Sequence, residues 1–349
     1  MLNSLDALAD GWDVVAGSSS TPMQRYAWVR SCAETSVAGG GLHIVAVGDV
    51  SRPAAVAPLV RRPGAWHRLE LLGLRVLQEP MDFVAVDASA LACLADALAR
   101  LGAPLALERI HGDSAAIPAL REAFRGRGFV ITRPALGWPG IALDEGPCEP
   151  EARLNAGRRS DLRRARRIAE RMGAVTCTIE SPVLPDLGRS LEEALRVEAA
   201  GWKGDEGSAL VSDTTRAAFY RRYAAAACAE GTLRLCFLRV GERIAAMQLA
   251  VEHGRRFWLL KIGYDEAFAR CSPGLLLILE TLRDAAARGL RSYEFLGAPE
   301  PWIRMWTKDI RPCVSLRIYP TRTRGLAALA SDVARSGWRR LSGLGSRGR

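Results

Sequence analysis

The sequence predicts two α/β units, each with a mixed sheet flanked by helices. A strand–helix–strand pattern occurs twice along the 349 residues, at 255–296 and at 81–110. A chain of this length is sufficient for two domains of about 150 residues each. A stretch rich in glycine and proline separates the two patterns and is the expected junction. We therefore expect a first domain at residues 1–147, a second at 148–320 and a basic tail at 321–349.

The composition is typical of a globular protein, with 49% apolar and 25% charged residues. No apolar run approaches the ~18 residues of a membrane span, and the first residues lack the basic start of a signal peptide. We therefore expect a cytoplasmic protein with no transmembrane segment. The eight cysteines contain no CxxC pair and the four histidines are isolated, so we expect neither a metal site nor a disulfide framework.

The net charge of +10 is concentrated in two segments. Residues 151–172, expected to form one helix, carry eight arginines against three acids, and residues 321–349 carry seven arginines against one. Clustered charge of one sign indicates an anionic partner, although a solvated arginine face explains the basic helix equally well. No helix-turn-helix or zinc-finger pattern is present, so we expect no DNA binding.

The first half begins with a helix at 21–35, because Thr21 is a suitable N-cap and Pro22 suits the first helical position. Strand-like runs follow at 43–49, 54–62 and 69–73. The first strand–helix–strand pattern then comprises residues 81–87, 88–101 and 104–110. Asp87 stands at the start of its helix, where a carboxylate would repel a phosphate. We interpret this half as a copy that keeps the fold and has lost a cofactor loop.

The second half continues after the basic helix with a strand at 174–180 and a helix that ends near residue 200. Asp213 is expected to cap a helix at 214–229. Two antiparallel strands, joined at Gly241-Glu242, then lead into the second strand–helix–strand pattern. The order is helices, a β-meander and then β–α–β.

The helix of this second pattern has clear boundary signals: Ser272 as N-cap, Pro273 at the first position and Gly289 as the stop. The strands on either side should pair in parallel. A helix N-terminus presents unpaired N–H groups and a positive dipole end, which suit a phosphate, with Arg270 close by. The same setting would lower the pKa of the Cys271 thiol. Ser-Pro-Gly also begins helices that bind nothing, so this motif alone decides little.

The run LLKIGYDEAFARCSPGLLLILETLRDAAARGLRSYEFLGAPEPWIRMW, preceded by Glu198-Ala-Ala-Gly-Trp-Lys-Gly204, carries a family resemblance. It resembles the acetyltransferase-like family named after a cellulose-biosynthesis protein, within the GNAT superfamily. That family is similar to the Fem-type aminoacyl transferases, which carry two GNAT folds in tandem. The resemblance implies tandem GNAT-like folds with a degenerate N-terminal copy.

The resemblance also assigns the donor site. It implies that Leu260, Lys261 and Ile262 line the pantetheine arm of an acyl-CoA. The pyrophosphate would be held by a second group of residues: Arg270, Cys271, Ser272, Pro273 and Gly274. The usual GNAT loop is richer in glycine than this one, which has only Gly274.

The catalytic and acceptor residues are expected on the neighbouring loops. The resemblance makes Glu198 the candidate general base or acceptor-binding carboxylate. It also implies parallel strands that splay apart at the cofactor, where backbone near Ile262 would meet the oxyanion. Tyr264 and Asp265 are candidates for acid or orienting roles. Relatives often carry a tyrosine–lysine pair where this chain has Trp302-Ile303, and indole cannot replace a phenol as an acid.

The acceptor is expected to contact two short segments that each contain a tryptophan and a lysine. Only three lysines occur in this arginine-rich chain, in the segments GWKG, LLKIGYD and MWTKD, which suggests that these positions require lysine. The expected acceptor residues are Trp202, Lys203, Trp306 and Lys308.

These observations predict an acyltransferase that uses acetyl-CoA and no metal. The expected acceptor is an amino or hydroxyl group of a sugar, envelope precursor or other small metabolite. Two alternatives remain open: a Fem-like transferase that takes its aminoacyl group from tRNA, and a non-catalytic partner in polysaccharide biosynthesis.

Overall fold

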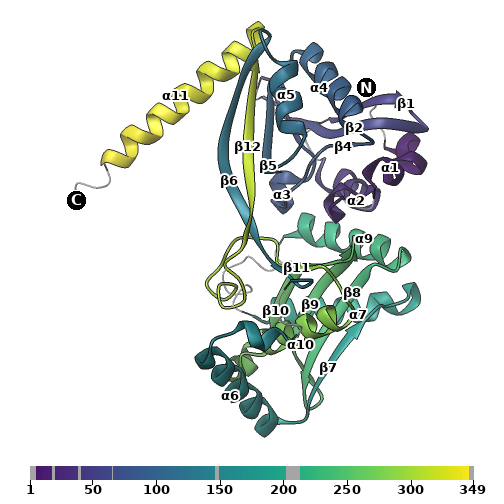
Figure 1. Cartoon of the computed structure of the whole chain (residues 1–349), viewed down its shortest axis with the longest axis vertical. Coiled ribbons are helices and arrows are strands. Elements are labelled where there is room, and N and C mark those ends of the chain that lie inside the picture. Colours follow the sequence, from purple (N-terminus) through teal and green to yellow (C-terminus); the bar gives the residue numbers. More distant parts are fainter. Residues whose placement is uncertain are drawn as a thin grey trace. The chain divides into compact units, whose positions relative to one another are not determined.

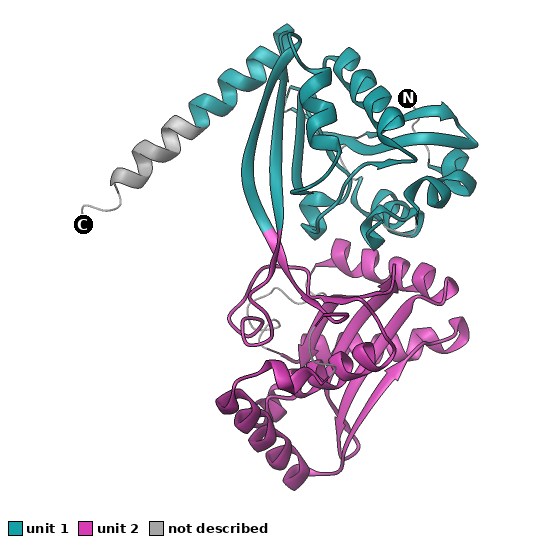
Figure 2. Cartoon of the chain, in the orientation of Figure 1, with its two compact units in different colours: residues 1–136, 312–349 teal, residues 137–311 magenta. Residues whose placement is uncertain are grey.

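The computed structural model describes residues 5–17, 20–37, 41–64, 66–145, 149–201 and 213–345, with side chains described through residue 335. The chain divides into two compact units (Figure 2). Unit 1 comprises residues 1–136 and 312–349, and unit 2 comprises residues 137–311. This division differs from the expected boundaries, because the strand near residue 314 and the basic tail belong to unit 1. The physical reason is strand pairing: Cys313 to Ile318 pair antiparallel with Leu105 to His111.

Unit 1 combines helices with a mixed sheet (Figure 1). Its elements are η1 (Asp6–Leu8), α1 (Ala9–Ala16), η2 (Pro22–Gln24), α2 (Tyr26–Ser36), β1 (Leu42–Asp49), β2 (Arg52–Arg61), β3 (Leu69–Leu71), α3 (Leu74–Leu77), β4 (Val84–Ala85), α4 (Ala88–Leu101), β5 (Leu105–His111), α5 (Ala116–Ala123), β6 (Gly128–Ala142), β12 (Ile310–Pro320) and α11 (Thr323–Gly345).

The sheet of unit 1 has the order β1-β2-β3-β5-β12-β6. The predicted strand–helix–strand unit is present, but its first strand was assigned wrongly. β3 pairs in parallel with β5, whereas β4 within the expected strand 81–87 pairs with β2 in antiparallel fashion. The helix α4 begins and ends as predicted, and the Asp87 side chain accepts a hydrogen bond from the Ala90 N–H at 2.7 Å. Such a cap stabilises the helix start.

Unit 2 follows the order predicted for the second half (Figure 1). Its elements are η3 (Pro150–Arg153), α6 (Ala156–Met172), β7 (Val175–Glu180), α7 (Leu184–Ala199), α9 (Thr214–Ala229), β8 (Leu233–Val240), β9 (Arg243–His253), β10 (Arg256–Tyr264), η5 (Glu266–Cys271), α10 (Pro273–Ala287) and β11 (Ser292–Glu294). The long β6 also contributes its last residues to this unit, where Gly140 to Ala142 pair with β11.

The sheet of unit 2 has the order β6-β11-β10-β9-β8-β7. β10 and β11 pair in parallel, as predicted for strands joined by a crossover helix. The hairpin between β8 and β9 turns at Gly241, and the one between β9 and β10 turns at Gly254 and Arg255, which all have positive φ. Such turns match the twist of the strands they join. Asp213 caps α9 by accepting the Arg216 N–H at 2.9 Å, as expected.

Helices cover both faces of this sheet. Residues of α6 and α10 share one apolar core with Phe257 and Leu259 of β10. α7 packs against β8, β9 and β10, and Lys261 of β10 lies over the Tyr220 ring of α9. The basic helix is shorter than predicted: residues 150–153 form a separate 3-10 turn, and the Asn155 side chain caps α6 by accepting the Arg158 N–H at 2.9 Å.

Candidate functional site

A cavity of about 350 Å³ lies in unit 2 between α7, β10 and the start of α10. It brings together many of the sequence-predicted site residues. Its lining comprises Glu198, Gly201, Ile262, Gly263, Tyr264, Ala269, Ser272, Pro273, Gly274, Leu275, Ile278, Glu300 and Trp302. The cavity therefore combines mainly apolar walls with a few polar groups, which is typical of small-molecule sites.

The cavity follows the part of β10 that has no parallel partner strand. β11 pairs with β10 only from Arg256 to Trp258, and β11 ends at Glu294 while β10 continues to Tyr264. The two strands therefore separate at the level of the cavity. This geometry agrees with the splayed strands that the family resemblance implies.

A one-residue irregularity in β10 determines which side chains face α10. The register with β9 shifts between Leu259 and Lys261. Phe257 and Leu259 face α10 before the shift, and Ile262 and Tyr264 pack against the same core after it. A bulge of this kind re-aims the side chains that follow it. The sequence gives no clear signal for this shift.

Two glycines allow α7 to approach the end of β10 closely. A Cβ built on Gly263 would lie 2.7 Å from the Cα of Glu198, and one on Gly201 would lie 2.7 Å from the carbonyl oxygen of Tyr264. Any side chain at either position would force the backbones apart. Glycine thus places Glu198, which is only 1% exposed, in the cavity wall.

Tyr264 presents a phenol to the cavity. Burial raises its pKa, and the hydrogen bond and negative charge of Glu266 raise it further. The phenol therefore stays protonated at neutral pH and can donate a proton or a hydrogen bond. Asp265 does not line the cavity. It accepts the Ala267 N–H at 2.9 Å and forms an ion pair with Arg243 at 2.7 Å, so its contacts organise the 3-10 turn.

The start of α10 differs in detail from the prediction. Ser272 is the N-cap, but its backbone is left-handed (φ 45°) and its side chain forms no capping hydrogen bond. Its carbonyl oxygen accepts the Leu275 N–H at 3.0 Å, and Pro273 has no N–H. The first turn therefore offers fewer donors to an anion than an ordinary helix start.

Gly274 leaves open space rather than satisfying a backbone constraint. A Cβ at this position would contact Ile262 and Tyr264 side-chain atoms at 3.8 and 3.9 Å, which is ordinary van der Waals distance. The position can accept a side chain, and that side chain would occupy the cavity. The residues present thus fit a ligand that passes between the helix start and β10.

Several predicted donor residues lie outside the cavity lining. Leu260 is buried in the sheet, Lys261 points toward α9, and Arg270 is exposed beside the helix start. Cys271 is fully buried and its thiol donates to the Phe268 carbonyl at 3.1 Å. Burial raises its pKa, so the prediction of a lowered pKa was wrong.

Of the two expected acceptor segments, only the one that contains Trp306 and Lys308 lies within the described residues. Trp202 and Lys203 lie outside the described residues. Trp306 is buried in the core of unit 2 and Lys308 is exposed, and neither lines the cavity.

Glu300 and Trp302 line the cavity instead of the predicted acceptor residues. The Trp302 indole N–H donates a hydrogen bond to the Glu300 carboxylate at 2.5 Å. Sequence reasoning selected neither, although the Glu-Pro-Trp motif following β11 is visible in the sequence.

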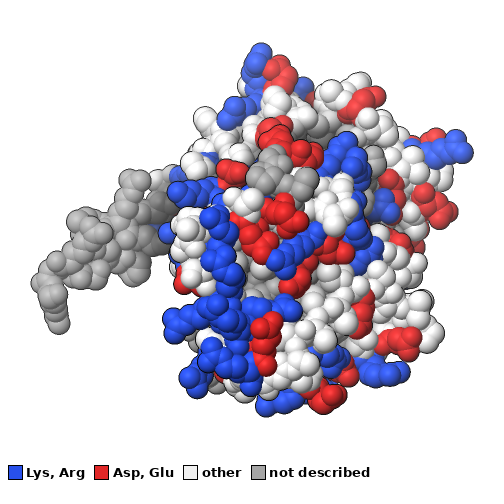
Figure 3. Space-filling view, turned by 60° about the horizontal axis from the view of Figure 1, so that its bottom comes forward, with Lys and Arg blue, Asp and Glu red and all other residues white. Residues whose placement is uncertain are grey.

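The basic side of α6 is a separate feature of unit 2. Arg166 pairs with Glu280 at 3.0 Å, whereas Arg163, Arg164 and Arg167 are exposed and form no ion pair within the described ranges. Lys and Arg side chains gather on the face shown in Figure 3, with acidic side chains among them. This surface keeps unneutralised positive charge.

No group of three or more His, Cys, Asp or Glu side chains is placed to hold a metal ion in the described part of the chain. The helices that the structure describes include none that is both long and apolar enough to cross a membrane.

Comparison with known proteins identifies the domain that contains the cavity. Residues 156–304 match the family model described as an acetyltransferase (GNAT) domain. No curated protein sequence matches the chain. Several solved structures are similar in fold over most of the chain.

Three of these structures illustrate the similarity in fold. One is the C-terminal domain of a protein named as a lysylphosphatidylglycerol synthetase from Agrobacterium fabrum: TM-score 0.53, 14% identity, 87% of this chain and 92% of that one. A second is FemX: TM-score 0.54, 12% identity, 85% and 92%. A third is a conserved protein of unknown function from Bacteroides thetaiotaomicron: TM-score 0.56, 10% identity, 84% and 89%. At these identities the likeness extends to the fold.

Proposed function

We propose that this chain, an acyltransferase with a GNAT domain at residues 156–304, transfers an acyl group from acetyl-CoA to a small acceptor. The acceptor supplies an amino or hydroxyl group, as in a sugar or an envelope precursor. The observation that carries the proposal is the cavity itself, which joins a buried carboxylate, a protonated phenol and a helix N-terminus along the splayed end of β10.

The donor enters between β10 and the start of α10. Ile262, Leu275 and Ile278 supply apolar walls for its pantetheine arm. The positive end of the α10 dipole and the exposed guanidinium of Arg270 stabilise the pyrophosphate. Because the first turn offers few free N–H groups, Arg270 contributes more here than it would beside a glycine-rich loop.

Acyl transfer then requires two proton movements. Glu198 takes the proton from the acceptor nitrogen or oxygen as that atom attacks the thioester carbonyl. The tetrahedral intermediate collapses when the carbon–sulfur bond breaks, and Tyr264 donates its proton to the departing thiolate. Glu300, at 2.5 Å from the Trp302 indole, is placed to position the acceptor at the cavity wall.

Donor binding gives the most direct test. Millimolar acetyl-CoA and CoA should each raise the thermal midpoint by a few degrees, because a ligand at 100 times its Kd adds about 2.7 kcal/mol. ATP serves as a control for the nucleotide portion. In Gly274→Val the shift should disappear while the midpoint of the free protein stays close to that of the parent, since the added Cβ would meet only ordinary contacts and the cavity has room for the two methyl groups.

The matched control is Asp87→Asn, which changes the charge at the corresponding helix start of unit 1 and should leave the acetyl-CoA shift intact. An equal loss of the shift in both variants, or no shift in the parent protein, would contradict the proposed donor site.

A second function is favoured by one observation. The unpaired arginines of α6 suit an RNA backbone, so the acyl donor would be an aminoacyl-tRNA. Binding of tRNA that weakens steeply with salt, and that is lost in an Arg163→Ala, Arg164→Ala, Arg167→Ala variant, would support it. Donor binding to acetyl-CoA without tRNA binding would exclude it.

A further inference from the structure

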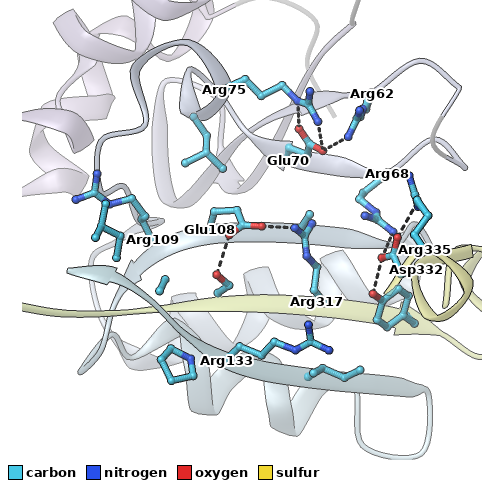
Figure 4. A pocket seen from close by; sticks show the side chains of 18 of the residues that line it. Arg62, Arg68, Glu70, Arg75, Glu108, Arg109, Arg133, Arg317, Asp332 and Arg335 are labelled. Atoms are coloured by element: carbon cyan, nitrogen blue, oxygen red, sulfur yellow. Dashed lines mark hydrogen bonds and ion pairs between the residues drawn. The ribbon is translucent and has the colours of Figure 1, made fainter. Parts of the chain in front are cut away.

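Unit 1 contains a cavity of about 880 Å³ that the acyl-transfer proposal does not use. β5, β6 and β12 line it, and α3 and α11 contribute residues at its edges (Figure 4). In β12, Arg317 and Tyr319 line the cavity, whereas Leu316 and Ile318 are fully buried. The two-residue period of the strand thus gives the sheet one apolar face and one charged, hollowed face.

The charge of this cavity is strongly unbalanced. Seven arginines line it, against three carboxylates. Figure 4 shows the labelled arginines extending toward the cavity from several different elements. A hollow lined mostly by one sign of charge focuses the electrostatic field, so this excess indicates that the cavity attracts anions.

Two of the three carboxylates are each shared by two arginines. Glu70 accepts from Arg75 at 2.7 Å and lies 3.4 Å from Arg62. Asp332 accepts from Arg68 at 2.6 Å and from Arg335 at 2.7 Å. A single carboxylate neutralises only one guanidinium and leaves several of the ten N–H donors of such a pair without an acceptor.

Two arginines show this surplus most clearly. Arg68 is only 4% exposed, and its Nε is buried without a hydrogen-bond partner within the described residues. A buried cationic donor in this state is costly unless an acceptor arrives. Arg133 is exposed at the cavity wall and forms no ion pair in the described part of the chain. Arg133 is therefore available to phosphate oxygens, and Arg68 adds a positive charge behind it.

The backbone beside the cavity is also strained. Gln78 and Arg109 both line it and both have left-handed backbones, with φ of 57° and 53°. The Arg109 guanidinium donates to the Gln78 carbonyl, which holds the two together. Strained residues of this kind persist only where their surroundings enforce them, and they concentrate at binding sites.

We propose that this cavity binds a small molecule through a diphosphate group. One of the seven arginines, Arg109, also pairs with Glu79 at 4.0 Å, just outside the lining. The remaining surplus of about three positive charges complements the two or three negative charges of a diphosphate. Planar guanidinium groups match phosphate oxygens in bidentate fashion, which explains why the cavity uses arginine. Its volume falls within the range of small-molecule sites, about 300–1,000 Å³, so there is room for a further group attached to the diphosphate.

The test is calorimetric titration of the full chain with inorganic pyrophosphate at 50 mM salt. Arg133→Glu should raise the Kd at least about 10-fold, because a hydrogen bond to a charged group is worth about 1.5–3 kcal/mol. Since Arg133 forms no ion pair among the described residues, this variant should fold normally. Arg164→Glu makes the same charge change on α6 of unit 2 and should alter the Kd less than two-fold.

A second variant should change the Kd in the opposite direction. Glu70→Gln removes the carboxylate that competes for Arg62 and Arg75, so pyrophosphate should bind more tightly. The proposal is overturned if pyrophosphate does not bind, if Arg133→Glu and Arg164→Glu weaken binding equally, or if Glu70→Gln weakens it in a protein that remains folded.

Two further probes identify the source of the diphosphate. UDP-glucose binding more tightly than pyrophosphate would indicate a soluble nucleotide-linked ligand. Sedimentation with phosphatidylcholine vesicles that contain a polyprenyl diphosphate, but not with phosphatidylcholine vesicles alone, would indicate a lipid-linked diphosphate if Arg133→Glu abolishes it. UDP-glucose binding that Arg133→Glu leaves unchanged would place the nucleotide outside this cavity and contradict the proposal.

Discussion

The two units use the same strand–helix–strand arrangement, β10-α10-β11 and β3-α4-β5, with opposite chemistry at the helix start. In unit 2 the start of α10 carries Ser272, Pro273 and Gly274 and borders a cavity of about 350 Å³. In unit 1 the start of α4 is capped by Asp87, and a cavity of about 200 Å³ beside it is lined by Asp82 and Asp87.

The difference shows what topology alone does not supply. A parallel strand pair with a crossover helix creates space beside a helix N-terminus in both units. In unit 1 the Asp87 carboxylate takes up a backbone donor of the helix start, the Ala90 N–H, at 2.7 Å. Asp82, which lines the same cavity, accepts the N–H of Phe83 before β4 at 2.7 Å. The carboxylates of unit 1 therefore repel an anionic ligand such as the pyrophosphate of an acyl-CoA. The same backbone geometry in unit 2 would admit that ligand. The further anion site that we infer for unit 1 uses the charged face of its sheet instead.

The largest expected effect is on the acyl-transfer rate, and it distinguishes Glu198 in unit 2 from Asp82 in unit 1. Glu198→Gln should lower the acyl-transfer rate by about 10²–10⁴-fold, the usual contribution of a general base. Acetyl-CoA binding should persist, because the amide keeps the size of the side chain that packs against Gly263. The measurement is single-turnover acyl transfer together with the thermal shift.

Asp82→Asn is the matched change in unit 1 and should leave the rate unaltered. Equal rates for the parent protein and Glu198→Gln would rule out Glu198 as the base.

The next effect concerns the close approach of α7 to β10. Gly263→Ala should lower the free energy of unfolding by about 1–3 kcal/mol, because the added Cβ would lie 2.7 Å from the Glu198 Cα. Denaturant unfolding measures this. Gly188→Ala, in the same helix α7 with no neighbouring atom within 4 Å, should instead raise stability by about 0.5–1 kcal/mol. Loss of stability in both variants would show that the effect is not specific to the contact.

Periodicity and boundary residues predicted most elements but not their partners. α4, α9 and α10 begin where capping residues and proline predict, because those signals are local. The strand 81–87 directly precedes the helix at 88–101, yet β3 supplies the parallel partner of β5. That choice depends on contacts between distant residues, as does the pairing of β12 with β5 across about 200 residues of sequence.

The candidate site was predictable to the same extent. Glu198, Tyr264 and Gly274 follow from the motif and lie together in one cavity. Trp306 was predicted to contact the acceptor, but the cavity is lined by Trp302 instead. Both residues follow β11 in irregular structure, so no periodicity indicates which indole faces the cavity. Likewise, the register shift at Leu260 and the capping contact of Asp265 depend on backbone geometry that residue type does not specify.

The pH dependence of stability tests whether Asp82, in the cavity beside the start of α4, is protonated in the folded state. Burial raises the pKa of Asp82 from its usual value of 3.8 to about 6, against the lowering effect of its hydrogen bonds to Ser114 and Phe83. The folded state therefore holds this proton more tightly than the unfolded state. The contribution of Asp82 to stability is fully present below pH 3.8 and is lost as the pH rises to about 6.

Asp82→Asn removes this loss. Its free energy of unfolding at pH 7 should exceed that of the parent by about 1–3 kcal/mol, and the gain should vanish near pH 4. Denaturant unfolding at both pH values measures the difference. A gain of the same size at pH 4 and pH 7 would show that Asp82 does not titrate in this range.

The smallest effect compares the two helix caps directly. Asp87→Ala should destabilise the protein by about 1 kcal/mol, because its side chain satisfies the Ala90 N–H at the start of α4. Ser272→Ala should change stability by no more than a few tenths of a kcal/mol, because the Ser272 side chain forms no capping hydrogen bond and its backbone is already left-handed. Paired denaturant curves at low salt resolve a difference of this size. A cost of 1 kcal/mol for Ser272→Ala would mean that its hydroxyl caps α10 in solution. In that case the start of α10 would be occupied much as the start of α4 is, and the contrast between the two units would rest on Gly274 alone.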